Sequence, residues 1–335
     1  KYTDIEVFVF EFSQTATWYT VQRNQIIKAL PKDNFYSCGW IAKWTEENTK
    51  KQQNLINYLY EKNIDIVHLE ELPEKWPTYG DSTFNIELQK ELYNKNRPWK
   101  IVETLHSIDF NINTKVLNPD GYAFVINHHL TNTFKNKPGK KELIEYPIDY
   151  DIISNKPRHQ ILSEQGWRPI GEYHIVNVGL WTPGKNQKYL IDIAKILWEK
   201  YRWTYIFHLV GNQAQNFEDY WKPLMENLPP NIRIHGEKNE KDVSEYYKMA
   251  DLMLFTSTWE CNPIVLKEAI SNNIKIMAFK LDHYKGIYDN YINYLDGKVV
   301  DVIHSPIKYK TAISNPVKDF ANKHLKLYED ISNRR

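Results

Sequence analysis

Apolar residues follow two alternating patterns along the chain. Short uninterrupted apolar runs have the length of strands, and the segments between them carry apolar residues at helical spacing. The runs predict strands at 5–12, 36–44, 64–69, 98–104, 122–127, 173–178, 205–210, 232–235, 252–255 and 274–279. The spaced segments predict helices at 18–30, 48–63, 187–200, 216–228, 242–250, 263–273 and 316–332. Strands that alternate with helices in this way indicate parallel sheets in an α/β protein.

The alternation is interrupted once, by the polar stretch 154–169, which predicts an interdomain linker. A chain of 335 residues is long enough for two domains with cores of their own. We therefore expect two facing Rossmann-like domains, an N-terminal one at 1–160 and a C-terminal one at 161–315. A C-terminal helix at 316–335 follows, and packing back on the first domain is one option for it.

Composition narrows the class of protein. A formal net charge of +1 gives no overall attraction for nucleic acid. The two cysteines, Cys38 and Cys261, have neither metal-site spacing nor a disulfide framework, which fits a reducing, cytoplasmic setting. The sequence has no apolar run of the roughly 20 residues that span a bilayer. Peripheral contact with a membrane stays an open alternative.

The segment 251–273 carries the strongest chemical signal, with the sequence DLMLFTSTWECNPIVLKEAISNN. A buried strand runs into a short loop and then a helix, and Pro263 suits the first turn of that helix. The free N–H groups and positive dipole at a helix N-terminus attract phosphate. Glu260 lies before the helix and Glu268 within it, and carboxylates accept hydrogen bonds from sugar hydroxyls. The segment therefore predicts a site for a phosphate and the sugars beside it.

Ser257, Glu260 and Glu268 form the pattern S-x-x-E-x7-E, which resembles the signature of the retaining GT-B glycosyltransferases of glycosyltransferase family 4, the group 1 type. Two further segments, NVGLWTPGKNQ and GEKNEKDVSEYYKMAD, are similar to motifs of that family. The resemblance covers about residues 170–300 and implies a GT-B fold, in which the N-terminal domain at 1–160 would bind the acceptor and the C-terminal domain at 161–315 would bind the nucleotide sugar. In the family, the first of these segments supplies an arginine and a lysine to the donor diphosphate. Lys185 matches the lysine, whereas Leu180 occupies the position of the arginine.

The resemblance also implies roles for the residues of the signature. Glu260 would contact hydroxyls of the donor sugar, and Glu268 would hold the ribose hydroxyls. Ser257 would belong to the same donor site. The backbone N–H groups of Asn262 and Ile264 would face the phosphate or the sugar.

The resemblance implies roles for three further positions. Backbone at Lys238, just after Gly236, would meet the nucleotide base. Gly211 ends a strand where backbone approaches the ligand. His106 resembles a histidine that faces the reacting sugar from the N-terminal domain.

These roles together predict a hexosyltransferase that moves a sugar from a nucleotide-diphosphate sugar, UDP-sugar favoured, to an acceptor hydroxyl with retention. The acceptor would be a glycan, a lipid-linked molecule or a protein, and no other cofactor is expected. The D-x-D letters at Asp149 and Asp151 fall where we expect a turn, so we predict no metal. Electrostatic stabilisation and positioning would carry the catalysis.

A second interpretation is a catalytically silent GT-B module that binds a sugar nucleotide or a partner protein. Leu180 and the glycine-free loop at 13–17 favour it, because the family has an arginine and a glycine-rich loop there. The presence of Lys185, Glu260 and Glu268 argues against it. A sugar-nucleotide epimerase of the same fold is a third interpretation, which would need further acidic and basic groups.

Overall fold

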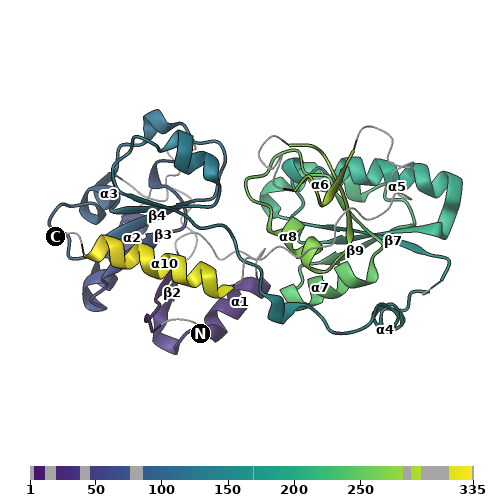
Figure 1. The fold of residues 1–335 in the computed structure, drawn as a ribbon, viewed down its shortest axis with the longest axis horizontal. Coiled ribbons are helices and arrows are strands. Elements are labelled where there is room, and N and C mark those ends of the chain that lie inside the picture. Colours follow the sequence, from purple (N-terminus) through teal and green to yellow (C-terminus); the bar gives the residue numbers. More distant parts are fainter. Residues whose placement is uncertain are drawn as a thin grey trace. The chain divides into compact units, whose positions relative to one another are not determined.

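The computed structural model describes residues 4–11, 20–37, 46–75, 86–168, 170–281, 288–295 and 317–333. The chain forms two compact units: unit 1 comprises residues 1–17, 23–146 and 317–335, and unit 2 comprises residues 18–22 and 147–316. Figure 1 labels their helices and strands. The loop predicted at 13–17 and most of the strand predicted at 36–44 lie outside the described residues.

Unit 1 is built on parallel strands in two sheets, of order β1-β2 and β3-β4-β5-β6. The strands are β1 (Val9–Glu11), β2 (Phe35–Ser37), β3 (Ile66–Leu69), β4 (Lys100–Leu105), β5 (Gly121–Phe124) and β6 (Lys140–Leu143). The helices are α1 (Thr20–Ala29), which begins in unit 2, α2 (Glu46–Glu61), α3 (Ile86–Leu92) and α10 (Val317–Ser332).

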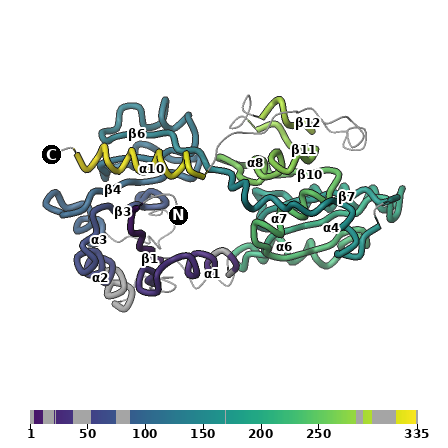
Figure 2. The backbone as a smooth tube through the Cα atoms, turned by 60° about the horizontal axis from the view of Figure 1, so that its bottom comes forward, coloured from purple at the N-terminus to yellow at the C-terminus, as the bar shows by residue number. Residues whose placement is uncertain are grey.

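Alternation along β4 divides the core of unit 1 between the two faces of the larger sheet. Ile101 packs with apolar residues of α2 and α3, whereas its neighbour Val102 packs with Leu327 and Ile331 of α10. Helix α10, yellow in Figures 1 and 2, therefore lies against the sheet although it comes last in sequence. Gly121 of β5 admits it closely, because a Cβ there would lie 3.2 Å from Leu327 Cδ1.

Unit 2 is a six-stranded parallel sheet of order β12-β11-β10-β7-β8-β9. The strands are β7 (Tyr173–Val178), β8 (Tyr205–Val210), β9 (Ile232–Gly236), β10 (Leu252–Phe255), β11 (Lys275–Ala278) and β12 (Ile292–Tyr294). The helices are α4 (Arg158–Glu164), α5 (Gln187–Tyr201), α6 (Glu218–Met225), α7 (Glu240–Met249) and α8 (Ile264–Ser271).

The order of the unit 2 strands reverses at β7. From β7 the chain builds outward through β8 to β9, then returns to place β10 on the other side of β7. Helix α5 packs on the face that carries Ile175, and α4, α7 and α8 pack on the face that carries Val176. In open α/β sheets, ligands bind at the carboxyl ends of the strands beside such a reversal. The loops after β7 and β10 are therefore the place to look for a site.

The predicted strands 173–178, 205–210 and 252–255 are confirmed residue for residue, and the helices predicted at 187–200 and 316–332 match α5 and α10 within a residue. Of the strand predicted at 5–12, the described residues form β1 from Val9 to Glu11, and residue 12 lies outside the described residues. The sequence did not predict α3, β6 or β12.

The linker predicted at 154–169 is wrong, because helix α4 forms there within unit 2. Ile161 and Leu162 are fully buried in the core with α7 and α8, and Arg158 pairs with the Asp251 carboxylate at 2.9 Å. Two adjacent apolar residues suffice to fix a short helix in an otherwise polar stretch. The boundary between the units falls between residues 146 and 147.

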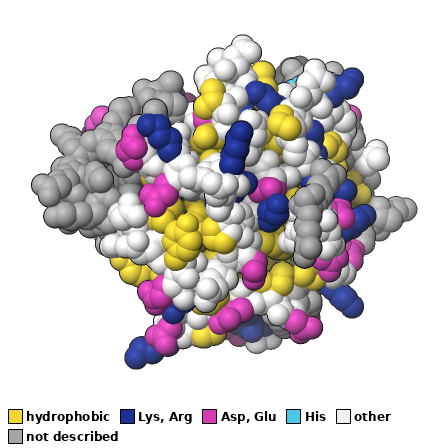
Figure 3. All heavy atoms as spheres, turned by 90° about the vertical axis from the view of Figure 1, so that its left-hand side faces the viewer, with side chains coloured by type: hydrophobic (Ala, Val, Ile, Leu, Met, Phe, Trp, Pro, Cys, Tyr) yellow, Lys and Arg dark blue, Asp and Glu magenta, His cyan; other side chains and the backbone are white. Residues whose placement is uncertain are grey.

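Charge is mixed on the surface of the molecule that Figure 3 shows. Basic and acidic side chains are interspersed on that face, and hydrophobic side chains gather between them. Such a surface produces no extended field of one sign of the kind that attracts nucleic acid. Within the described ranges, none of the helices is long and apolar enough to cross a membrane.

Candidate functional site

The loops that follow β7 and β10 are tied to each other by hydrogen bonds. The Thr258 N–H donates to the Gly184 carbonyl at 2.8 Å, and the Thr256 hydroxyl donates to the Lys185 carbonyl at 2.8 Å. Thr182 caps the turn before Lys185, and Asn186 adopts the left-handed conformation that starts α5. These bonds fix the position of Lys185 beside the end of β10.

Lys185 and Glu260 form an ion pair across this reversal point. Lys185 Nζ donates to Glu260 Oε1, and the exposed fractions of the two side chains are 29% and 9%. Ser257, the third predicted residue here, is buried. The pair brings a cation that can meet a diphosphate next to a carboxylate that can accept hydrogen bonds from sugar hydroxyls.

Helix α8 begins immediately after this ion pair. Pro263 is its N-cap residue, in an extended conformation, and Ile264 is exposed at its first position. The first N–H groups of an α-helix have no partner within the helix, so the backbone from Asn262 to Ile264 lies where an anion is stabilised. The predicted backbone donors thus follow Glu260 directly in sequence, and the ion pair brings Lys185 to the same end of α8.

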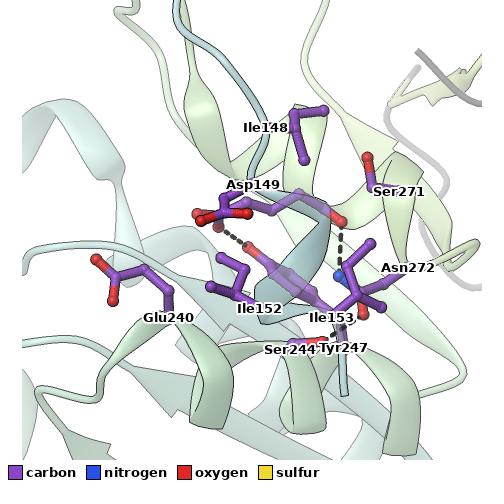
Figure 4. Close-up of a pocket in the computed structure, with 10 residues that line it drawn as sticks. Ile148, Asp149, Ile152, Ile153, Glu240, Ser244, Tyr247, Ser271 and Asn272 are labelled. Carbon is purple, nitrogen blue, oxygen red and sulfur yellow. Dashed lines mark hydrogen bonds between the residues drawn. The ribbon is translucent and has the colours of Figure 1, made fainter. Parts of the chain in front are cut away.

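Glu268 lies one turn further along α8 and lines a small cavity with Tyr247 of α7 (Figure 4). The Tyr247 hydroxyl donates to Glu268 Oε2 at 3.1 Å. Burial raises the pKa of Glu268 to about 7, the Tyr247 hydrogen bond opposes this rise, and the Glu240 charge adds to it. The cavity measures about 10 Å³, room for roughly one water molecule or one hydroxyl group.

The two walls of this cavity come from segments far apart in sequence. Ile148 and Asp149 lie on one side in Figure 4, and Ser271 and Asn272, where α8 ends, lie on the other. The Asp149 carboxylate accepts from the Asp151 N–H at 3.0 Å and so caps a short turn, as the sequence predicted for the D-x-D letters. Across the described residues, no group of three or more His, Cys, Asp or Glu is arranged to hold a metal ion. The metal-free reaction stays a prediction.

Gly211 was predicted as a place where backbone approaches a ligand, and the structure shows that it also approaches other backbone. Its φ is +140°, and a Cβ there would lie 2.0 Å from the Gly179 carbonyl oxygen. The Gly179 N–H donates to the Val210 carbonyl at 2.9 Å. Gly211 is therefore required for the close approach of the loops after β7 and β8.

Of the remaining predicted residues, Lys238 belongs to unit 2 and His106 to unit 1. Lys238 lines a second cavity of unit 2, on another face of α7 from the one that carries Tyr247. His106 belongs to unit 1, and both of its ring nitrogens are bonded: Nδ1 to the Tyr146 hydroxyl, and Nε2 to Glu70 Oε2 at 2.9 Å. A contact from His106 to a sugar would have to replace one of these bonds.

Leu180, which stands where the family has an arginine, takes part in the local backbone structure. Its carbonyl accepts from Gln187 Nε2 at 2.9 Å, and Gln187 is fully buried.

Sequence reasoning missed the residues that position the predicted ones. Thr256 and Thr258 join the two loops, and Tyr247 supports Glu268. Glu70 and Tyr146 fix the ring of His106. Only the hydroxyl-rich end of strand 252–255 gave a signal, since threonines at a strand end often bond to a neighbouring loop.

Residues 162–328 match a family model described as glycosyl transferases group 1. The chain contains a group 1 glycosyl transferase domain. Among curated proteins, an α-galactosylglucosyldiacylglycerol synthase from Streptococcus pneumoniae is 37% identical over 79 residues. That segment spans 24% of this chain and 21% of the synthase. The enzyme class of the domain is therefore glycosyltransferase.

Solved structures extend the likeness of this glycosyl transferase to the N-terminal unit. A glycosyltransferase from Rickettsia africae superposes with a TM-score of 0.66 at 17% identity, covering 92% of this chain and 88% of the other. The Anabaena protein HepE, in complex with UDP and glucose, superposes with a TM-score of 0.63 at 14% identity, covering 97% of this chain and 84% of the other. WaaG, a glycosyltransferase involved in lipopolysaccharide biosynthesis, superposes with a TM-score of 0.57 at 14% identity, covering 97% of this chain and 94% of the other. These likenesses confirm the GT-B fold predicted from the sequence.

Proposed function

We propose that the protein transfers a sugar from a nucleotide-diphosphate sugar, with UDP-sugar favoured, to an acceptor hydroxyl, with retention and without a metal. The observation that carries this proposal is the Lys185–Glu260 pair, which lies between β7 and β10 at the start of α8. A cation and a helix N-terminus suit the diphosphate of such a donor, and a carboxylate beside them suits its sugar. The UDP preference is supported by the likeness to HepE, a structure solved with UDP and glucose.

Each residue has a distinct part in this proposal. The Lys185 ammonium and the N–H groups at the start of α8 bind the diphosphate and stabilise the charge that develops on it as the glycosidic bond breaks. Glu260, freed from Lys185, accepts hydrogen bonds from the sugar and orients it. Glu268 accepts from a ribose hydroxyl that takes up the space beside Tyr247. The leaving diphosphate then accepts the acceptor's proton on the same face of the sugar.

The test is consumption of the donor by the whole chain. UDP-, GDP-, ADP- and CMP-sugars are incubated with the protein in EDTA, and released nucleotide is measured with water as the default acceptor. We expect release from one nucleotide class, abolished by Glu260→Gln and retained in Lys188→Ala, whose exposed lysine pairs with Asp192. NMR of the product sugar then tests retention of the anomeric configuration.

A catalytically silent module is the second candidate, because Leu180 leaves the diphosphate with one fewer cation than in the family. Binding of a sugar nucleotide without any release of nucleotide would favour that module and reject the transferase. Activity that disappears in EDTA and returns with a divalent cation would reject the metal-free reaction.

A further inference from the structure

A continuous chain of hydrogen bonds crosses three neighbouring strands of unit 2. His174 on β7 bonds through Nδ1 to His208 Nε2 on β8 at 3.0 Å. His208 Nδ1 bonds to His235 Nε2 on β9 at 3.0 Å, and His235 Nδ1 bonds to the Tyr246 hydroxyl of α7 at 2.9 Å. His174 and His208 are fully buried, and the chain ends at a cavity lined by His235 and Tyr246.

The direction of these bonds depends on which ring nitrogen of His174 carries the proton. Burial lowers the pKa of all three histidines, that of His235 to about 4, so each ring is neutral at neutral pH with one donor and one acceptor nitrogen. His174 Nε2 lies 3.6 Å from a Glu172 carboxylate oxygen, which favours the N–H at that nitrogen. His174 Nδ1 then accepts from His208, His208 Nδ1 accepts from His235, and His235 Nδ1 accepts from Tyr246.

The Tyr246 hydroxyl consequently uses its one proton inside the protein. Its oxygen then has only lone pairs left, so it can accept a hydrogen bond from a ligand in the cavity but cannot donate one. The hydrogen-bond chain therefore determines whether the Tyr246 hydroxyl donates or accepts at the cavity.

The cavity at this end of the chain, which we call the α7 cavity, has a volume of about 390 Å³ and is partly open to solvent. The residues that line it include Gln165, Trp167, His235, Asp242, Glu245 and Tyr246. Helix α7 separates the α7 cavity from the small cavity beside Glu268, because Glu240, Ser244 and Tyr247 line the small cavity. The two cavities thus use different faces of one helix.

Several hydrogen-bond acceptors line the α7 cavity. Asp242 and Glu245 add carboxylate oxygens to the Tyr246 oxygen, and Trp167 adds an aromatic ring. Charge is balanced close by, because Lys156 pairs with Glu245 at 3.0 Å and Lys238 lines the same cavity. A neutral ligand with several hydroxyl donors and an apolar face satisfies such a lining.

We propose that the α7 cavity is a second carbohydrate-binding site, which takes a neutral sugar residue independently of the nucleotide-sugar donor. Its volume lies within the range of small-molecule sites. A glycosyltransferase with such a site would hold a glycan on the donor-binding unit away from the reacting bond.

The test is saturation-transfer NMR on the full chain with glucose, galactose, maltose and lactose, each with and without saturating UDP. We expect at least one sugar to bind and to stay bound when UDP is present. Tyr246→Phe should weaken that binding about tenfold, because it removes one acceptor. Gln165→Ala, which leaves the histidine chain intact, should weaken it as well.

The matched control is Tyr201→Phe, a tyrosine at the end of α5 outside the cavity, which should leave sugar binding unchanged. Displacement of the sugar by UDP would overturn the proposal, because the cavity would then belong to the donor site. Absence of binding by all four sugars would also overturn it. Equal binding to the wild type and to both cavity variants, with thermal melting showing that they are folded, would have the same meaning.

Discussion

At the scale of single residues, the ion pair between Lys185 and Glu260 sets the chemistry of the site. The two residues are 75 positions apart in sequence, and each side chain offsets the charge of the other while no ligand is bound. A diphosphate competes with Glu260 for the Lys185 ammonium, which releases the carboxylate for the sugar. Donor binding and orientation of the sugar are therefore one event in this account.

Substitution of Lys185 by alanine should weaken binding of the nucleotide sugar by about 10- to 100-fold, because a charge-assisted hydrogen bond to phosphate is lost. Isothermal calorimetry with the donor measures this change. Lys188→Ala, a neighbouring lysine with an exposed ion pair, should bind like the wild type. If both variants weaken donor binding equally, the effect comes from the loss of one positive charge on the protein and not from a contact of Lys185 with the phosphate.

Glu268 should make the stability of the protein depend on pH in a defined direction. Burial raises its folded pKa to about 7 from 4.5, so the folded state binds the extra proton between those values. The contribution of the group is present below pH 4.5 and is lost as pH rises through 7. Glu268→Gln should therefore be more stable than the wild type by roughly 2 to 3 kcal/mol at pH 8.

Denaturant unfolding at pH 5 and pH 8 checks this difference, which should nearly vanish at the lower pH. The same variant should bind the donor more weakly, because the neutral amide oxygen is a weaker acceptor for the ribose hydroxyls than a carboxylate. A gap between variant and wild type that does not change with pH would contradict the raised pKa.

The sequence could identify individual residues of the site but could not show what supports them. Lys185, Glu260 and Glu268 stand in motifs that a single chain displays. Tyr247 bonds to Glu268 only because α7 and α8 pack side by side, and no spacing in the sequence encodes that contact. The histidine chain was also beyond prediction, since it depends on the register of three strands.

At the scale of elements, the approach of the loops after β7 and β8 limits what the sequence can be. Gly211 faces the Gly179 carbonyl so closely that no side chain fits between them. The strands beside these loops, β7 and β8, were predicted with the right ends because they are largely apolar and mostly buried. Strand β6, with the sequence KKEL, is half-buried and carries two lysines, so its pattern gave no such signal.

Gly211→Ala should destabilise the protein by roughly 3 kcal/mol or more, because a positive φ and an overlap with backbone both oppose the methyl group. Gly171→Ala is the matched control, since its φ is +89° but nothing lies within 4 Å of the added atom. It should cost only about 1 kcal/mol. Similar losses in chemical denaturation for the two variants would show that the close approach to Gly179 is not a constraint.

At the scale of the whole molecule, α10 at the C-terminal end of the chain packs on the sheet of unit 1, which the N-terminal part of the chain forms. The match to the glycosyl transferase family extends to residue 328, yet α10 packs on the sheet of unit 1. Folding of unit 1 therefore depends on residues that follow the whole of unit 2 in sequence. The polar stretch at 154–169 misled the sequence analysis at this scale, because a helix that packs inside one unit has the composition of a linker.

Leu327→Ala should cost about 3 kcal/mol, because it opens a cavity between α10 and β5. Lys326→Ala changes an exposed neighbour on the same helix and should be nearly neutral. Proteolysis under native conditions, with cleavage sites read by mass spectrometry, should show the Leu327 variant opening first in unit 1. Cleavage confined to unit 2 would contradict the assignment of α10.

The central claim is that unit 2 binds a nucleotide sugar through Lys185 and Glu260 without a metal. The most direct measurement is thermal melting of the wild type and of Glu260→Gln with UDP-, GDP-, ADP- and CMP-sugars in EDTA. A donor at about 100 times its dissociation constant adds about 2.7 kcal/mol to the free energy of unfolding. The account predicts a raised melting temperature with one nucleotide class in the wild type and a smaller rise in the variant. An unchanged melting temperature with all four donors in the wild type would contradict it.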